Sequence, residues 1–185
     1  MAERVCPSWV GYILLSPLRK LFENPDKMLG QFVRKGMIVL EPGCGMGYFT
    51  LPLAGMVGPR GRVVALDIQE KMLSVLGRRA KRAGLTDRID LRLIGADGLG
   101  IDDLFGKADF AVLLHVTHEV PDQDAFFIEL WAALKSGGKL LVVEPKGHVS
   151  QNQFEQSLNI AYKVGFTSES LPYKKHGRVA LLGKS

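Results

Sequence analysis

The chain has 185 residues, of which 46% are hydrophobic and 23% charged, a globular composition that excludes the disordered and fibrous classes. Its formal net charge of +5 favours an acidic partner, but charge alone does not separate nucleic acid from other ligands. The longest apolar stretches have the length of strands and are too short to cross a membrane.

The first half of the chain alternates apolar strand patterns with helix patterns. Ser16 and Asn24 each precede a proline, which is a start signal for a short helix. Gly84 follows the second long helix pattern, where glycine commonly ends a helix. The elements expected after the opening helices are a strand at 37–41, a helix at 47–56, a strand at 62–67, a helix at 69–83 and a strand at 88–97.

The second half of the chain continues the alternation of strand and helix patterns and ends with two strand patterns in succession. Ser150 is placed to cap a helix that ends before Gly165. Two strand-like segments then follow with no helix between them, which favours an antiparallel hairpin. The elements expected in this half are a strand at 108–115, a helix at 124–135, a strand at 139–145, a helix at 151–164, a weak strand within 167–175 and a last strand at 177–183.

Strands that are apolar throughout and alternate with helices indicate a parallel sheet covered on both faces. We therefore expect an α/β fold, Rossmann-like and doubly wound, with a mostly parallel sheet and an antiparallel hairpin at its C-terminal edge. One domain is expected over residues 1–185, with 1–36 as an N-terminal helical segment that acts as a lid. Ligands of such sheets bind at the carboxyl ends of the strands.

A glycine loop follows the strand at 37–41, in the stretch "VLEPGCGMGYFT". The dinucleotide fingerprint requires its third glycine at the position of Tyr48, but the chain has Gly47 instead. Glu41 also stands two residues before Gly43, where repulsion of a pyrophosphate in a partly buried cleft costs about a few kcal/mol. A Walker loop is excluded because no Gly-Lys-Ser/Thr follows. The charge of Glu41 favours a cationic ligand.

At this motif the chain resembles the class I methyltransferases that use S-adenosyl-L-methionine (SAM), whose first motif is an acidic residue, a spacer and G-x-G-x-G. The resemblance covers about residues 37–182 and implies SAM as methyl donor and S-adenosyl-L-homocysteine as product. It implies that Glu41 is a counter-charge at the methionine end of SAM. The implied cofactor-binding residues of the loop are Gly43, Cys44, Gly45 and Gly47, and the Cys44 thiol is expected to pack as a small apolar group.

Two more acidic residues end strands that follow the glycine loop. Asp67 ends the strand at 62–67, at the spacing of a carboxylate that accepts hydrogen bonds from the ribose hydroxyls. Asp97 ends the next strand, and the resemblance implies that it accepts a hydrogen bond from the adenine amino group. Ile68 and Leu99 are then expected on the two faces of the adenine, and Gly98 is expected in the same cofactor-binding loop.

The acceptor is expected over the ends of the strands at 108–115 and 139–145. His115 is the preferred general base, since it ends a strand and imidazole titrates in the required range, and it is also expected beside the cofactor. His118 is the second catalytic candidate. An equally simple interpretation is that these histidines orient the loop backbone. The polar residues at the two strand ends are His115, His118, Glu119, Glu144, Lys146 and His148.

The sequence "HEVPD" resembles the small-molecule branch of the family, which includes quinone-ring C-methyltransferases and arsenite methyltransferases. This resemblance implies methyl transfer to a small molecule by in-line displacement, without a membrane span. Cys6 and Cys44 form no disulfide framework and no zinc motif, so the cytoplasm is expected. They also do not supply the cysteine set of arsenite enzymes. No metal is expected, although His115, Glu144 and His148 form a weaker alternative metal site.

Three other functions stay open at this point. A methyltransferase acting on RNA or another nucleic acid agrees with the positive charge, but the Asn/Asp-Pro-Pro-aromatic motif of enzymes that methylate base amines is missing after the strand at 108–115. The basic run at 78–82 is typical of an exposed helix face. A regulator that binds SAM without catalysis is the second alternative. A nicotinamide reductase is the third, and Glu41 disfavours it.

Overall fold

A computed structural model describes residues 15, 19, 23–95, 98–171 and 177–185 of the chain. The chain separates into two compact units, Met1–Gly95 and Ala96–Ser185. The predicted cap Ser16 lies outside the described residues, as does most of the predicted lid over 1–36. Both stay predictions, and so does the single domain over 1–185.

The first unit contains a parallel sheet with the strand order β3-β2-β1. Its strands are β1 (Ile38–Pro42), β2 (Arg62–Asp67) and β3 (Ile89–Leu93). The interiors of β1 and β2 are buried almost without interruption, as expected for strands of a covered parallel sheet. Parallel pairing brings the carboxyl ends of β1 and β2 to the same edge, where Glu41 pairs with Ala65 and Pro42 with Leu66.

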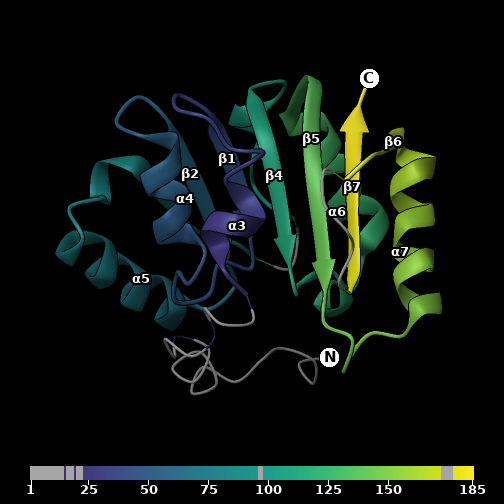
Figure 1. Ribbon diagram of the computed structural model, residues 1–185, viewed down its shortest axis with the longest axis horizontal. Helices are drawn as coiled ribbons and strands as arrows, with labels where there is room; N and C mark the ends of the chain where they lie inside the picture. The colour runs from purple at the N-terminus through teal and green to yellow at the C-terminus, as the bar shows by residue number, and fades with distance from the viewer. Residues whose placement is uncertain (1–14, 16–18, 20–22, 96–97, 172–176) are drawn as a thin grey trace. The chain divides into compact units, whose positions relative to one another are not determined.

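The helices of the first unit are α3 (Pro25–Leu29), α4 (Thr50–Val57) and α5 (Glu70–Arg82), with a 3₁₀ turn η1 at Thr86–Arg88. Asn24 caps α3 by accepting hydrogen bonds from two backbone N–H groups, which confirms the predicted cap. Figure 1 shows α4 in front of β2, and the helix packs against both β1 and β2. Helix α5 packs against β2 and β3 through an apolar face that includes Met72, Leu73 and Leu76.

The second unit contains strands in the order β4-β5-β7-β6. They are β4 (Ala108–Leu114), β5 (Leu134–Glu144), β6 (Phe166–Glu169) and β7 (Arg178–Lys184). Strand β5 is parallel to β4 and antiparallel to β7, and β7 is antiparallel to β6. The predicted antiparallel hairpin at the C-terminal edge is therefore confirmed.

The helices of the second unit are α6 (Gln123–Ala133) and α7 (Gln151–Val164), with 3₁₀ turns η2 (Asp102–Leu104) and η3 (Thr117–Glu119). In Figure 1, α6 passes behind β7 and α7 lies along β6. Asp122 caps α6, and Ser150 caps α7 as predicted. The turn η3 lies between β4 and α6, so β4 is followed by a short ordered loop that carries His118.

Two predicted boundaries in the first unit are wrong for steric and pairing reasons. The helix predicted to begin at residue 47 begins at Thr50 instead, because Gly47 has a φ of 82°, which lies outside the helical region. The strand predicted to reach residue 97 ends at Leu93. Its neighbour β2 ends at Asp67, and Asp67 pairs with Leu93, so no partner in β2 extends β3 further.

The end of α6 also differs from the prediction of a helix to residue 135. The helix ends at Ala133, and Leu134 already has the extended backbone of β5. Lys184 of β7 binds this helix end, where its ammonium group donates to the carbonyls of Trp131 and Leu134 at 2.6 and 2.7 Å. The lysine satisfies carbonyls that the last turn of a helix leaves without intrahelical partners. A register shift between β4 and β5 follows this irregular start.

None of the helices in the described part of the chain combines the length and apolarity that crossing a bilayer requires.

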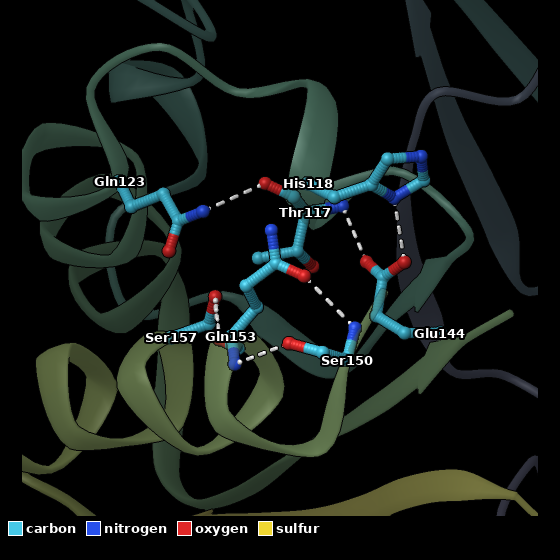
Figure 2. A network of polar contacts seen from close by, with 7 residues as sticks. All are labelled: Thr117, His118, Gln123, Glu144, Ser150, Gln153 and Ser157. Carbon is cyan, nitrogen blue, oxygen red and sulfur yellow. Dashed lines mark hydrogen bonds and ion pairs between the residues drawn. The ribbon is translucent and has the colours of Figure 1, made fainter. Parts of the chain in front are cut away.

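Substituting Ser150 by alanine is expected to destabilise the second unit. The Ser150 hydroxyl accepts from the Gln153 backbone N–H at 3.2 Å, and the Gln153 side chain accepts from the Ser150 N–H at 2.8 Å (Figure 2). Ser150→Ala should lower the free energy of unfolding by about 1 kcal/mol, measured by urea denaturation. Asn152→Ala on the exposed face of the same helix is the control, with an expected change within about 0.5 kcal/mol. Equal stability of both variants would contradict the capping role.

Candidate functional site

The glycine loop of the first unit connects β1 to α4 and is bound to the end of β2. The backbone N–H groups of Gly43 and Cys44 donate to the carbonyl of Leu66 at 2.8 and 3.1 Å. Gly43, Gly45 and Gly47 have φ values of 70°, 53° and 82°, in the left-handed region that side chains rarely adopt. The alternating glycines therefore give the loop a shape that other residues would strain.

Glycine is required at Gly47 and at Gly45 for different steric reasons. A Cβ atom at Gly47 would lie 2.2 Å from Leu76 Cδ1, so Gly47 permits the close packing of α5. A Cβ atom at Gly45 would meet nothing within 4 Å. Gly45 consequently leaves open space beside its backbone, as close approach of a ligand requires.

Asp67 ends β2 and holds the glycine loop through its carboxylate. Its Oδ2 atom accepts from the Gly45 N–H and its Oδ1 atom from the Gln69 N–H, both at 2.8 Å. The residue is 7% exposed. Burial raises the pKa of Asp67, and the hydrogen bonds from Gln69 and Gly45 lower it in part. Each carboxylate oxygen has a further acceptor site, so Asp67 can also accept hydrogen bonds from a ligand.

Glu41 lies in β1 beside the same loop and is more deeply buried, at 3% exposure. Burial raises the pKa of Glu41 from 4.5 to about 8, opposed by the Thr50 hydroxyl and reinforced by the charge of Asp67. Its Oε2 atom is buried without a hydrogen-bond partner in the described structure. Glu41 was expected as a ready negative charge, but the carboxyl group retains its proton at neutral pH until a cation or donor stabilises the ionised form.

Cys44 packs in the core of the first unit, as the sequence indicated for its thiol. It is 6% exposed and contacts an apolar cluster that includes Ala65, Leu73 and Leu76. Burial, with the nearby charges of Glu41 and Asp67, raises the pKa of the Cys44 thiol. A buried neutral thiol is unreactive, so Cys44 supports the loop through packing. Cys6 lies outside the described residues.

The residues predicted to bind adenine are placed only in part. Asp97 lies outside the described residues. Ile68 follows Asp67 and is 49% exposed, which leaves its apolar side chain available for contact. Leu99 is only 3% exposed, and its N–H donates to both carboxylate oxygens of Glu129 at 3.1 and 2.9 Å. Sequence reasoning did not single out Glu129, which binds the backbone of Leu99.

Gly98 also lies against Glu129. Its φ is 142°, and a Cβ atom there would be 2.7 Å from Glu129 Oε1. Glycine at this position thus permits the hydrogen bonds between Glu129 and Leu99. The prediction that Gly98 contacts the cofactor stays a prediction.

In the second unit, His115 follows β4 with an unusual backbone. Its φ is 63°, which is uncommon for a residue with a side chain and signals local strain. Its N–H donates to the carbonyl of Val143 in β5 at 2.8 Å. The bond fixes the turn that leads from β4 into η3, so the backbone of His115 has a structural role whether or not its ring takes part in chemistry.

His118 and Glu144 form a close pair at the carboxyl ends of the parallel strands β4 and β5. His118 Nδ1 lies 2.6 Å from Glu144 Oε2, and the Thr117 N–H donates to Glu144 Oε1 at 2.7 Å (Figure 2). The side chain of Glu144 is 2% exposed and that of His118 is 29% exposed. The hydrogen bond to Glu144 raises the pKa of His118, while burial lowers it in part. We call these two residues the His118–Glu144 dyad.

The polar residues predicted at these strand ends are therefore brought together only in part. His118 and Glu144 are in contact, whereas His148 and Lys146 are exposed. Within the described ranges, no group of three histidine, cysteine or acidic side chains has the arrangement of a metal site, so the alternative site of His115, Glu144 and His148 is not formed. The sequence places both side chains at one edge, because adjacent parallel strands end together, but it does not show which histidine meets Glu144.

Comparisons with known proteins agree with this geometry. Residues 33–175 match the profile of the family described as "Methyltransferase domain". The ubiquinone/menaquinone biosynthesis C-methyltransferase UbiE of Pasteurella multocida is 32% identical over 60% of this chain and 41% of its own. The demethylmenaquinone methyltransferase of Lactobacillus johnsonii is 28% identical over 78% of this chain and 61% of its own. The chain thus spans about half the length of these curated relatives.

Solved structures show the same fold. A SAM-dependent methyltransferase from Aquifex aeolicus superposes with a TM-score of 0.82 at 21% identity, covering 97% of both chains. A SAM-dependent O-methyltransferase from Thermotoga maritima has a TM-score of 0.69 at 18% identity, covering 92% of this chain and 71% of the other. The fold is Rossmann-like, with a mostly parallel sheet and antiparallel C-terminal strands, as predicted. By the family match over residues 33–175, the chain belongs to the methyltransferase domain family.

Proposed function

We propose that the protein transfers a methyl group from SAM to a small-molecule acceptor and releases S-adenosyl-L-homocysteine. The observation that carries the proposal is the presence of two buried acidic groups, Glu41 and Asp67, beside an open glycine loop. A phosphate would be repelled by Asp67 and would keep Glu41 from ionising, whereas a cationic ligand would be attracted to Asp67 and would stabilise the ionised form of Glu41. The sign of the charge therefore favours SAM over a nicotinamide dinucleotide.

The residues present fit SAM on structural grounds. Glu41 Oε2 is buried without a partner among the described residues, and an ammonium group would supply the missing donor. Asp67 has acceptor capacity beyond its two backbone hydrogen bonds, which suits the two hydroxyls of a ribose. Ile68 is half exposed next to Asp67 and suits the face of an adenine. Asp97 and Gly98 stay in the proposal as predicted neighbours of the adenine.

When bound, SAM supplies a methyl group on a positively charged sulfur that leaves readily. The chain contributes position, and holding two reactants in line is worth about 7–11 kcal/mol of the barrier. Glu41 and Asp67 hold polar ends of the cofactor, and the glycine loop permits close approach. His115, which was expected both beside the cofactor and as the base, stays a candidate for both roles, and His118 is the histidine that pairs with Glu144.

A small acceptor is supported by the names of the relatives, a ubiquinone/menaquinone biosynthesis C-methyltransferase and a demethylmenaquinone methyltransferase. A nucleic-acid substrate is less well supported, because guanidinium groups of the basic run on α5 are engaged within the protein. Arg79 donates to the carbonyl of Met46, and Arg78 donates to the Ser74 hydroxyl at 2.9 Å. The proposed location is the cytoplasm, as the cysteine content of the sequence indicated.

Calorimetric titration with SAM, S-adenosyl-L-homocysteine and NADH tests the cofactor assignment. We expect saturable binding of the two sulfur compounds and no binding of NADH, because only NADH carries a pyrophosphate. An acceptor screen scored by release of S-adenosyl-L-homocysteine then separates an enzyme from a regulator that only binds SAM. Saturable NADH binding without SAM binding would overturn the proposal.

Asp67→Ala should weaken SAM binding by about 1–3 kcal/mol through loss of hydrogen bonds to the ribose. The substitution also releases the Gly45 and Gln69 N–H groups, so the two effects must be separated. The 2′-deoxy and 3′-deoxy analogues of S-adenosyl-L-homocysteine do this in a double-mutant cycle. Removal of a hydroxyl should cost affinity in the parent protein and little in Asp67→Ala.

Asp90→Ala is the matched control for the Asp67 substitution. Asp90 is a carboxylate of the same unit that pairs with Arg92 at 2.9 Å. Its removal should leave the affinity for SAM unchanged. If deletion of a ribose hydroxyl costs the same in Asp67→Ala as in the parent protein, Asp67 does not contact the ribose and acts on the loop alone.

Glu41→Gln should abolish proton release on SAM binding. Because the pKa of Glu41 is about 8 in the free protein, most molecules carry a proton there at pH 7, and a bound cation would expel it. Calorimetry in two buffers of different ionisation enthalpy should detect release of about one proton per SAM in the parent protein and almost none in Glu41→Gln. Equal proton release from both proteins would show that Glu41 does not face the cationic end.

Glu41→Gln is also expected to change the pH dependence of folding stability. A carboxyl group whose pKa rises from 4.5 to about 8 on folding stabilises the fold fully below pH 4.5, and this contribution is lost as the pH rises toward 8. Glutamine keeps the shape and does not ionise. Thermal denaturation should therefore show Glu41→Gln gaining stability relative to the parent protein between pH 5 and pH 8.

A further inference from the structure

The His118–Glu144 dyad has a defined orientation. Both oxygens of the Glu144 carboxylate are engaged, one by the Thr117 N–H at 2.7 Å and the other by His118 Nδ1 at 2.6 Å. The Gln123 side chain in turn donates to the Thr117 carbonyl at 2.9 Å. Figure 2 shows these contacts as a connected network that joins the end of β5, the turn η3 and the start of α6. The carboxylate is thus held against rotation.

The network determines which nitrogen of His118 is available. An ionised carboxylate only accepts hydrogen bonds, so Nδ1 must carry the proton of the neutral ring. Nε2 then has a free lone pair and is the basic atom. The side chain of His118 is 29% exposed, while that of Glu144 is 2% exposed, so the ring is accessible to a second molecule and its carboxylate partner is not.

The charges that face His118 favour its protonated form. Glu144 of β5 acts through a hydrogen bond and through its charge, and Glu119 of the same turn adds a second negative charge. Partial burial acts in the opposite direction but is the smaller effect, because the pKa of His118 is raised overall. A proton taken up by Nε2 is therefore stabilised by Glu144.

We propose that His118 is the general base of methyl transfer, that Glu144 is its positioning residue, and that the acceptor carries a weakly acidic hydroxyl group. The inference rests on the proposed function and names the acceptor class for it. His118 Nε2 takes the hydroxyl proton, and the electron pair released strengthens the nucleophilic atom of the acceptor. The nucleophilic atom forms a bond to the methyl carbon of SAM while the bond between that carbon and sulfur breaks. The electron pair of the broken bond stays on the sulfur and neutralises its positive charge. The proton leaves His118 to solvent.

The chemistry of the dyad selects the acceptor class. An acceptor whose nucleophile is already ionised or carries a free lone pair, such as a carboxylate or a tertiary amine, needs no base. A hydroxyl on an aromatic or enol system does need one, and an imidazole is most effective when its pKa lies near the working pH. Burial of the Glu144 carboxylate carries a desolvation cost. A role in positioning the base explains why the fold keeps this carboxylate despite that cost.

Nuclear magnetic resonance of the imidazole nitrogens tests the dyad without any acceptor or cofactor. Loss of one signal in His118→Gln assigns the ring. We expect the neutral ring of His118 to carry its proton on Nδ1, and we expect Glu144→Gln to lower the pKa of His118. Glu119→Gln is the matched control and should lower it less, since Glu119 acts only through its charge. A proton on Nε2, or an unchanged pKa in Glu144→Gln, would overturn the dyad.

Binding of a hydroxyl compound tests the acceptor class. With S-adenosyl-L-homocysteine present, 1-naphthol should shift the Nε2 signal of His118, whereas 1-methoxynaphthalene should not, because it has no hydroxyl proton. His148→Gln, a substitution at an exposed histidine, should leave this response unchanged. No shift with 1-naphthol, or an equal shift with both compounds, would overturn the assignment of a hydroxyl acceptor.

Activity measurements separate a base from a structural residue. With the acceptor found by the screen, His118→Gln should lower kcat by about 100-fold or more and change the dissociation constant of SAM less than twofold. Glu144→Gln should lower kcat by a smaller factor and move the rising limb of the pH profile to lower pH. An unchanged pH profile in Glu144→Gln would overturn its positioning role. Failure of SAM to bind the parent protein would overturn the proposed function instead and leave the resonance results on the dyad standing.

Discussion

The candidate cofactor site depends on one buried carboxylate, that of Asp67. One of its oxygens binds the N–H of Gly45 in the loop after β1, and the other binds the N–H of Gln69 at the start of α5. A single side chain at the end of β2 thereby fixes the glycine loop and the entry to the next helix. The two bonds hold in place a loop whose three glycines have left-handed backbone that other residues would adopt only with strain.

Glu41 differs from Asp67, because its burial costs stability that hydrogen bonds within the described structure do not fully recover. Asp67 is buried with two backbone donors, whereas Glu41 Oε2 is buried with none among the described residues. Burial, opposed only in part by the Thr50 hydroxyl, raises the pKa of Glu41 to about 8 and makes ionisation costly for the free protein. Such a cost is typical of binding sites, where a group is stabilised only by its ligand. Glu41 is therefore better explained by a cationic ligand than by the stability of β1.

The sequence was sufficient for the features that depend on local patterns. Apolar runs placed the strands, Ser150 and Asn24 placed helix caps, and the glycine spacing with Glu41 indicated the class of cofactor site. Features that depend on contacts between distant residues were not predictable. The end of α6 is bound by Lys184, about fifty residues later in the chain, and sequence periodicity carries no record of such a bond. His115 was preferred over His118 for the same reason, because only the structure shows which histidine meets Glu144.

The two units use a common device. In each, a carboxylate that ends a buried strand binds a backbone N–H of a loop that follows a neighbouring strand: Asp67 of β2 binds the loop after β1, and Glu144 of β5 binds the turn after β4. The second oxygen differs, since that of Asp67 binds the backbone of Gln69 and that of Glu144 binds the ring of His118. A backbone N–H does not titrate near neutral pH, whereas an imidazole does. The same fold element therefore gives a fixed binding loop in the first unit and a titrating group in the second.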